Sequence, residues 1–480
     1  MRSYDESIPV NKAVMKPRPQ HKPNAPDATV LSGTPEVSDT PVASDQSDRS
    51  ATSGVVHAPV ASDTMHPFEA SAKTAAMSPR SLVARKLVLL LVATLTIMAG
   101  IIIAPSLPAI AVHFADNEQI DLLSRMVLTL PSLFVALSAP FAGMLADRYG
   151  RKRLLVTAIV LYGVSGASGL MADSLPALLA GRAALGIAIG GIITLSMALV
   201  GDYFSGAERE RYLGLQQAFV QLGGVIFVMS GGLLAEVHWR MPFVIYGAAL
   251  VLVPAVMLFL TEPVRYRPRH DAAGLTTAAG MNWPVVAVVC LLAFLINVSF
   301  YTVPSQLQFH MEALGIYNAS GFGLVLGSFN LAGGAIALCF GWFKRRFTTQ
   351  AIFLIGFTLM TGGFVLLSVS SGYGAMIAAN ITLGAGLGIV MPNVMSTAIG
   401  HSAPLLRGRI SGMVATSIFI GQFVSPFVSQ YWVRLAGYAD MFRNVGMIMA
   451  ALAVLSVLAA LHSRRGARNE QKNNANPRSY

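Results

Sequence analysis

The sequence predicts an all-α membrane protein with about twelve transmembrane helices in two parallel six-helix repeats. Three observations support this: the composition, a series of apolar runs of helix length, and an internal repeat. Of 480 residues, 54% are hydrophobic and only 12% are charged, whereas soluble domains carry about 25% charged residues. The runs are continuously apolar and do not alternate every second residue, so they do not favour a β-barrel.

Each apolar run is long enough to cross a hydrocarbon core roughly 30 Å thick. The runs begin near Leu87 and continue almost to the end of the chain. We expect helices over residues 86–108, 122–145, 154–172, 177–203, 212–235, 242–261, 283–303, 319–343, 350–371, 374–397, 409–433 and 441–462.

Composition also divides the chain outside these helices. Residues 1–82 are rich in Pro, Ser, Thr, Ala and Asp and have no apolar core, which predicts a disordered cytoplasmic tail. Translation from Met65 or Met77 is an alternative that would shorten it. We expect an N-terminal half over 83–262, a cytoplasmic linker over 263–281, a C-terminal half over 282–463 and a basic cytoplasmic tail over 464–480.

The net charge of +11 is distributed very unevenly along the chain. Lys and Arg gather in one alternate set of loops, which includes Arg148 and Arg346. By the positive-inside rule these loops face the cytoplasm, together with both termini. The basic pI therefore describes orientation in a bacterial inner membrane, and no nucleic-acid partner is expected. The opposite loops are assigned only Arg125, Arg240, Arg434 and Arg443.

An internal repeat appears when the chain is compared with itself at an offset of 198 residues. Gly143 then falls on Gly341, and Arg148 falls on Arg346. The Leu-Gly pair at 185–186 falls on that at 383–384, and Gly190 falls on Gly388, all without gaps. Six crossings return the chain to its starting side, so the two copies run parallel. Parallel repeats place a substrate cavity at their interface near the bilayer midplane.

Five ordered motifs carry a family resemblance over residues 83–463. GMLADRYGRKR at 143–153 resembles the signature loop of the major facilitator superfamily. The other four are PSLP at 105–108, GRAALGIAIGG at 181–191, DYFSGAER at 202–209 and WRMPF at 239–243. The resemblance implies a secondary transporter of the twelve-helix drug or metabolite:proton antiporter group.

The resemblance also implies a cytoplasmic gate at the signature loop. In the family this loop latches the cytoplasmic ends of the two halves in the outward-open state. Asp147, Arg148 and Arg151 would then pair with Asp202 or with the start of the eleventh helix. The alternative is a simple topological anchor, but an anchor needs no acid. The implied gate residues are Gly143, Asp147, Arg148, Gly150, Arg151, Asp202 and Arg209.

Arg182 lies about two turns into the fourth predicted helix, where a charge is costly and usually functional. We expect a role in coupling or in substrate binding; the alternative is that its side chain snorkels to the membrane surface. Asp121, one turn from Arg125, is a weaker candidate for a titrating acid. Gly186 and Gly190 follow Arg182 at steps of four and predict close helix packing.

Drug and metabolite exporters of this superfamily carry the motif G-x8-G-x3-G-P-x2-G-G, and the fifth predicted helix resembles it with one departure. Its glycine frame is kept at Gly214, Gly223, Gly231 and Gly232, but Phe227-Val228 replaces the central Gly-Pro. We expect this replacement to remove the motif's kink and close helix contact, which makes antiporter status less secure.

Amide side chains at membrane depth are candidates for the wall of a substrate cavity. Each is as easily explained by hydrogen bonds between helices as by a ligand contact. With Met and Phe and almost no fixed negative charge, they suit an amphipathic cargo. The candidates are Gln217, Gln221, Asn297, Asn330, Asn380 and Gln422.

Together these features predict proton-coupled efflux of a drug-like compound or secreted metabolite by alternating access. A proton-coupled importer of a small organic solute is the alternative, and a non-transporting scaffold or receptor is a third. No HExxH motif, metal-spaced His and Asp, or Gly-rich nucleotide loop is present, so no enzyme is expected. We expect no metal and no cofactor, the proton gradient as the energy source, and a monomer in the lipid bilayer.

Overall fold

The computed structural model describes residues 79–263, 283–401 and 406–475, with side chains described from Leu82 to Leu461 except Glu210. Within these ranges the chain is helical, with no strand. Nearly all of the predicted tail 1–82 and the predicted linker 263–281 lie outside the described residues. The described residues all belong to one compact unit, Met65–Tyr480.

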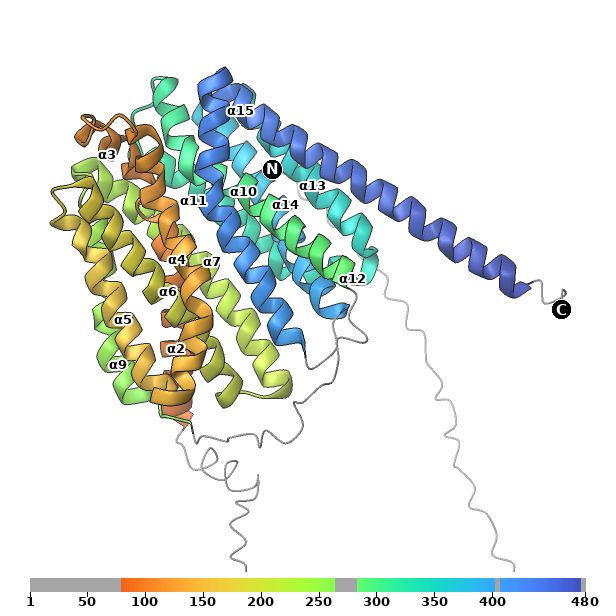
Figure 1. The fold of residues 1–480 in the computed structure, drawn as a ribbon, viewed down its shortest axis with the longest axis horizontal. Helices are drawn as coiled ribbons and strands as arrows, with labels where there is room; N and C mark the ends of the chain where they lie inside the picture. The colour runs from red at the N-terminus through yellow and green to blue at the C-terminus, as the bar shows by residue number, and fades with distance from the viewer. Residues whose placement is uncertain (1–78, 264–282, 402–405, 476–480) are drawn as a thin grey trace, which may run out of the picture. The chain divides into compact units, whose positions relative to one another are not determined.

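The first half of the described chain (red to yellow-green in Figure 1) contains eight α-helical elements. These are α2 (Pro79–Ile101), α3 (Leu107–His113), α4 (Ile120–Tyr149), α5 (Arg151–Ala167), α6 (Leu175–Tyr203), α7 (Gly206–Val237), α8 (Phe243–Gly247) and α9 (Leu252–Phe259).

The second half (green to blue in Figure 1) contains six α-helical elements. These are α10 (Trp283–Ala313), α11 (Ala319–Leu338), α12 (Phe340–Arg346), α13 (Thr349–Val369), α14 (Tyr373–Gly400) and α15 (Arg407–Ala475).

Among the described residues, ten helices are long and apolar enough to cross a membrane. The last of these spans 55 residues and contains Gly437, whose non-helical φ of 81° divides it into two segments. The shorter apolar helix Phe243–Phe259 corresponds to the sixth predicted span. All twelve predicted segments are therefore helical, and the predicted fold class is confirmed.

Several predicted helices are interrupted where the sequence analysis expected one continuous element. The first breaks into a 3₁₀ turn at Ala104–Ser106, and the sixth contains a 3₁₀ turn at Ala248–Val251. In both places a proline lies in the first turn of the helix that follows. Proline is tolerated in a first turn, but inside a continuous helix its missing N–H and its ring would disrupt the hydrogen bonding. The eighth breaks at Cys339. The predicted tail 464–480 begins inside α15, which continues to Ala475.

The same close helix contact at a glycine occurs at equivalent positions in both halves, in agreement with the predicted duplication. A Cβ atom on Gly186 would lie 2.3 Å from the Pro131 carbonyl oxygen, so α6 packs directly on the α4 backbone. The equivalent Cβ on Gly384 would lie 2.2 Å from the Phe329 carbonyl oxygen, so α14 packs in the same way on α11. The predicted close packing at Gly186 is confirmed, because no larger residue fits without separating the helices.

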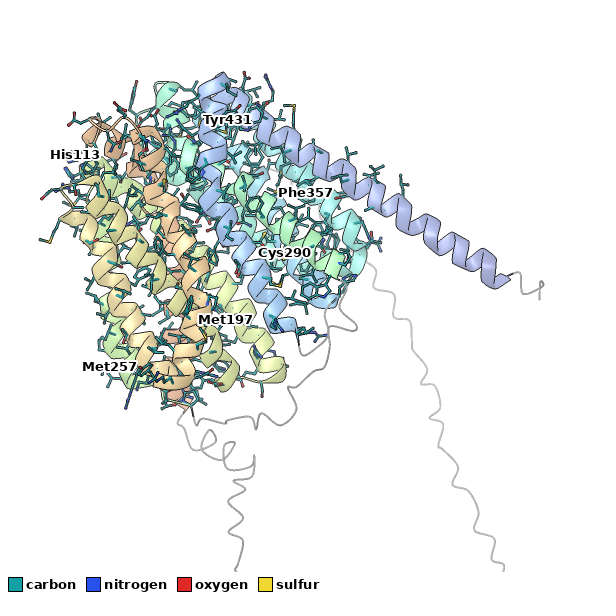
Figure 2. All side chains as sticks on the ribbon, in the orientation of Figure 1. His113, Met197, Met257, Cys290, Phe357 and Tyr431 are labelled. Atoms are coloured by element: carbon teal, nitrogen blue, oxygen red, sulfur yellow. The ribbon has the colours of Figure 1, made fainter. Side chains whose placement is uncertain are left out.

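The bundle has two distinct ends. We call the end where α4 is followed by α5 the loop end, which contains Gly150, and the end with α3 the far end; α3 lies at the top of Figure 1. Figure 2 labels Met257 near the loop end and His113 near the far end. The halves meet along two seams, where α7 packs on α11 and α4 packs on α15.

Candidate functional site: a cavity between the two halves

A cavity of about 430 Å³ lies between the halves and is lined by helices from both. The first half contributes α2, α4, α6 and α7, and the second contributes α10, α11, α14 and α15. Aromatic rings form part of the wall: Phe300 stacks on Phe329 at 4.9 Å, and Tyr301 meets Phe300 edge-on at 5.4 Å. A site shared in this way changes shape whenever one half moves on the other.

Four of the six predicted amides line this cavity: Gln217, Gln221, Asn330 and Gln422. Ser132 donates a 2.8 Å hydrogen bond to Gln422 Oε1, which joins the halves across the cavity. Gln422 Nε2 in turn lies 3.5 Å from the Oδ1 of Asn297, a buried residue behind the wall. Asn380 is fully buried in α14, bonds to the Met376 carbonyl and does not line the cavity.

The far end is closed by a buried arginine that the sequence analysis assigned to an external loop. Its position in the helix predicted over 122–145 is confirmed, but it does not belong with the loop charges, because Arg125 lies inside α4 and is only 1% exposed. Its Nε donates to Gln306 Oε1 at 2.8 Å, and its Nη2 donates to the Tyr438 hydroxyl at 3.3 Å. Its guanidinium also lies 3.8 Å from the ring centroid of Phe309. All three partners belong to the second half.

Further contacts surround this arginine at the same end. Gln306 Nε2 donates to Ser429 Oγ at 2.9 Å and lies 3.3 Å from Gln430 Oε1, which ties α10 to α15. The exposed carboxylate of Asp121 lies 3.7 Å from Arg434 Nη2. Because its partner is exposed and distant, Asp121 has the geometry of a weak surface ion pair.

The seam between α7 and α11 also lies toward the far end. Glu236 Oε1 accepts a 3.1 Å hydrogen bond from the Ser320 N–H at the start of α11. The expected loss of close contact at Phe227-Val228 is wrong, since a Cβ on Gly323 would lie 3.0 Å from the Val228 carbonyl oxygen. A glycine of α11 thus provides the close approach that α7 lacks. The helix α7 runs without interruption from Gly206 to Val237.

At the loop end, the predicted gate residues form contacts within the first half. Arg151 forms an ion pair with Asp202 and donates to the Ala198 carbonyl at 3.2 Å, which ties α5 to the end of α6. Gly150 makes the reversal with a φ of 95°, a conformation that glycine adopts without steric cost. Gly143 has no such constraint, because a Cβ there would only touch Thr194 at 3.8 Å.

Glu262 is a functional candidate that the sequence analysis missed. Its carboxylate accepts the N–H groups of Arg151 and Lys152 at 2.6 and 2.9 Å, at the N-terminus of α5. Acidic groups are stabilising there because the helix dipole and unpaired N–H groups favour negative charge. A Cβ on Gly150 would lie 2.9 Å from this carboxylate. The sequence did contain a signal for this residue: Glu262 is an acid directly after the sixth apolar run, on the same side as the basic loop.

The remaining loop residues are exposed. Asp147 is exposed and has no ion pair among the described residues, while Arg148 stacks near Tyr149 with its guanidinium 5.5 Å from the ring centroid. Arg209 is exposed at the start of α7. In the second copy of the loop, Lys344 turns inward to Thr349 Oγ1 at 2.9 Å, and burial lowers the pKa of Lys344.

Arg182 is fully buried inside the first half and does not snorkel. Its Nη2 donates to the Gly166 carbonyl at 2.9 Å, and its guanidinium lies about 5 Å from the ring centroids of Phe243 and Tyr246. Its Nε and Nη1 have no hydrogen-bond partner among the described residues. It lies outside the cavity lining, but the Tyr246 hydroxyl bonds to the carbonyl of the cavity-lining Ala99 at 3.0 Å.

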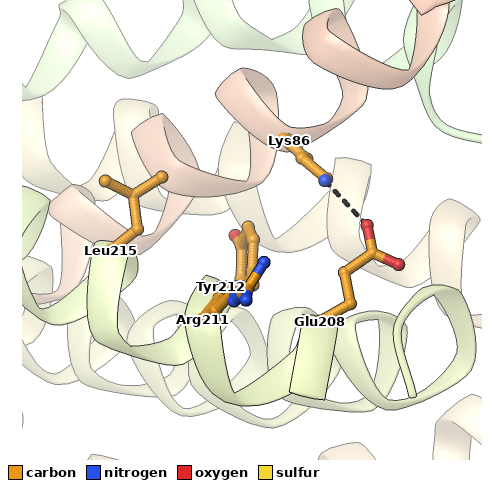
Figure 3. Close-up of a pocket in the computed structure, with 5 residues that line it drawn as sticks. All are labelled: Lys86, Glu208, Arg211, Tyr212 and Leu215. Atoms are coloured by element: carbon orange, nitrogen blue, oxygen red, sulfur yellow. Dashed lines mark ion pairs between the residues drawn. The ribbon is translucent and has the colours of Figure 1, made fainter. Parts of the chain in front are cut away.

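A second hollow of about 440 Å³ lies between α2 and α7 at the loop end (Figure 3). Lys86 Nζ and Glu208 Oε1 form a 2.7 Å ion pair across it. All the residues that line it belong to the first half. The central cavity is therefore the better candidate for a site that responds to movement between the halves.

Comparison with known proteins agrees with this architecture. The chain is 27% identical to Multidrug resistance protein 1 of Bacillus subtilis, over 68% of this chain and 84% of that protein. It is 26% identical to the class C Tetracycline resistance protein of Escherichia coli, over 76% of this chain and 93% of that protein.

Among solved structures, the fold matches a bacterial homolog of the human lysosomal transporter Spinster in an inward-facing and occupied conformation. The TM-score is 0.62 with 19% identity, over 81% of this chain and 98% of that chain. The family model of the Major Facilitator Superfamily matches residues 89–426 and again 289–479. The chain is therefore a multi-pass membrane protein that belongs to the major facilitator superfamily.

Proposed function

We propose that the protein exports a drug-like compound or secreted metabolite in exchange for protons, by alternating access across the bacterial inner membrane. The observation that carries this proposal is the cavity shared by both halves. The names of the two drug-resistance relatives support the direction of transport. The distribution of Lys and Arg supports a cytoplasmic loop end and cytoplasmic termini.

In this orientation the structure corresponds to an inward-facing state. The hydrogen bonds of Arg125 and Glu236 to the second half lie at the far end, which would face outward. At the loop end, the contacts of Arg151 with Asp202 and Glu262 stay within the first half. Cargo would thus enter the cavity from the cytoplasm.

Inverted membrane vesicles test the proposed function. An imposed inward-acid proton gradient should drive accumulation of tetracycline or a related compound in vesicles that contain the protein, and an uncoupler should abolish it. Gradient-driven accumulation in whole cells instead would indicate an importer. No gradient-dependent flux of any compound in either preparation would favour a scaffold and contradict the proposal.

Asp147 should act as the reversible part of the loop-end latch. It is exposed and has no ion pair with any residue that the structure describes, so it is available to bind the second half when the loop ends close. Exposed ion pairs contribute up to about 1 kcal/mol. We therefore expect Asp147→Asn to slow efflux roughly two- to fivefold at unchanged protein abundance.

The repeat offers a matched control for this prediction. Arg345 occupies the position equivalent to Asp147 and is also exposed. Its replacement by Ala should leave the efflux rate unchanged. Equal efflux rates for the Asp147 and Arg345 variants would indicate that the loop acts only as a topological anchor.

A further inference from the structure

The central cavity has an unusual electrostatic character. Its polar lining consists of the four amides Gln217, Gln221, Asn330 and Gln422 with hydroxyl groups such as Ser132, and no Asp, Glu, Lys, Arg or His is among its lining residues. The cavity therefore offers hydrogen bonds to a ligand without a fixed charge.

The buried charged side chains in helices that line the cavity are positive. Arg125 is 1% exposed and Arg182 is fully buried, and both lie in helices that line the cavity. The buried polar and charged residues of the described chain include no Asp or Glu. Because screening by water is weak inside a protein, these arginines make the interior unfavourable for a cation.

Aromatic rings do not compensate for this. A cation over an aromatic face gains about 0.5 to 2 kcal/mol, whereas burial of an unpaired ion costs several kcal/mol. The faces of Phe300 and Phe329 are already stacked on each other at 4.9 Å. The cation therefore remains at a net disadvantage in the cavity.

Two of the amides are available to a ligand. Gln217 and Gln221 lie one turn apart on α7, line the cavity and have no hydrogen-bond partner among the described residues. Each amide carries two donors and an acceptor. Gln217 is exposed and Gln221 is half-buried, so both side chains can exchange hydrogen bonds with water for hydrogen bonds with a ligand. A bound molecule with its own acceptors and donors would satisfy them.

From this lining we infer that the cavity binds uncharged aromatic compounds that carry hydrogen-bond acceptors, and that it discriminates against monovalent cations. This inference rests on the proposed function only in that the cavity is the cargo site. It names a substrate class that the family membership leaves open.

Three probes of similar shape and different charge test the inference. Triphenylphosphine oxide is neutral and has a strong acceptor, tetraphenylphosphonium is a cation and tetraphenylborate is an anion. We expect the purified full-length protein in detergent to bind triphenylphosphine oxide at least tenfold more tightly than tetraphenylphosphonium by calorimetry. The inference would be overturned if either ion bound more tightly than triphenylphosphine oxide, if all three probes bound with equal affinity, or if none of them bound.

An isosteric substitution should weaken the discrimination. Gln221→Glu adds a carboxylate to the wall without breaking a described hydrogen bond, so tetraphenylphosphonium affinity should rise at least tenfold. Gln119→Glu adds the same charge at an exposed position outside the cavity and should change nothing. An equal rise in both variants would overturn the inference. Binding requires no proton gradient, so these results are independent of the vesicle assay.

Discussion

Substitution of Arg125 by Met is expected to open the far end of the transporter. The variant loses the hydrogen bonds to Gln306 and Tyr438, which join α4 to α10 and α15. Hydrogen bonds from a charged donor contribute about 1.5 to 3 kcal/mol each, so the two together hold the halves by at least about 3 kcal/mol. A loss of that size shifts the equilibrium between the closed and open far end about a hundredfold.

A cysteine in the cavity reports this shift directly. Ser132→Cys, in a background with Cys290→Ser and Cys339→Ser, places one thiol on the cavity wall. A membrane-impermeant maleimide added to whole cells should label this thiol many times faster when Arg125 is Met. Efflux should fall as well, because a far end that remains open cannot complete the cycle.

Arg443→Met is the matched control for this experiment. Arg443 also lies in α15 toward the far end, but it is exposed and pairs with Asp440 in its own helix at 2.9 Å. Its loss should leave the labelling rate unchanged. Identical rates in the Arg125 and Arg443 variants would show that the buried arginine does not hold the halves together.

The contrast between Arg125 and Gly186 shows what can be predicted from the sequence alone. The glycines of α6 recur at a helical step and again at the repeat offset, so the local pattern alone predicts the seam that the structure contains. The burial of Arg125 depends on Gln306 and Tyr438, which are 181 and 313 residues away. No local pattern carries that information, and a count of apolar residues places the arginine at a helix boundary.

The amides show an intermediate case. Their depth in the membrane follows from the apolar runs, and four of the six line the cavity. Whether an amide faces the cavity depends on the rotation of its helix about its own axis. The sequence predicts that rotation poorly when apolar residues surround the whole helix. Asn380 illustrates this, because its Nδ2 bonds back to Met376 in its own helix. Helix breaks such as the one at Cys339 also fall within apolar runs and leave no change in composition.

Arg182→Met should abolish proton-driven efflux while preserving the fold. The guanidinium is buried with two nitrogen atoms that lack hydrogen-bond partners among the described residues. Replacement of a buried ion pair by apolar residues of similar volume is often neutral or stabilising, by up to about 4 kcal/mol, and loss of a buried charge that has no acidic partner leaves no counter-charge behind. We therefore expect an unchanged or higher Tm for the purified variant, together with gradient-driven flux in inverted vesicles at the level of vesicles without the protein.

The route from Arg182 to the cavity can be tested with a second variant. Tyr246 lies against the guanidinium and bonds through its hydroxyl to the carbonyl of Ala99, which lines the cavity. Tyr246→Phe keeps the ring but removes this bond, so it should lower efflux by less than Arg182→Met does. If the Phe variant is as active as wild type while the Met variant is inactive, Arg182 acts without this tyrosine hydroxyl. If the Met variant transports at the wild-type rate, Arg182 has no role in coupling, and its burial serves packing alone.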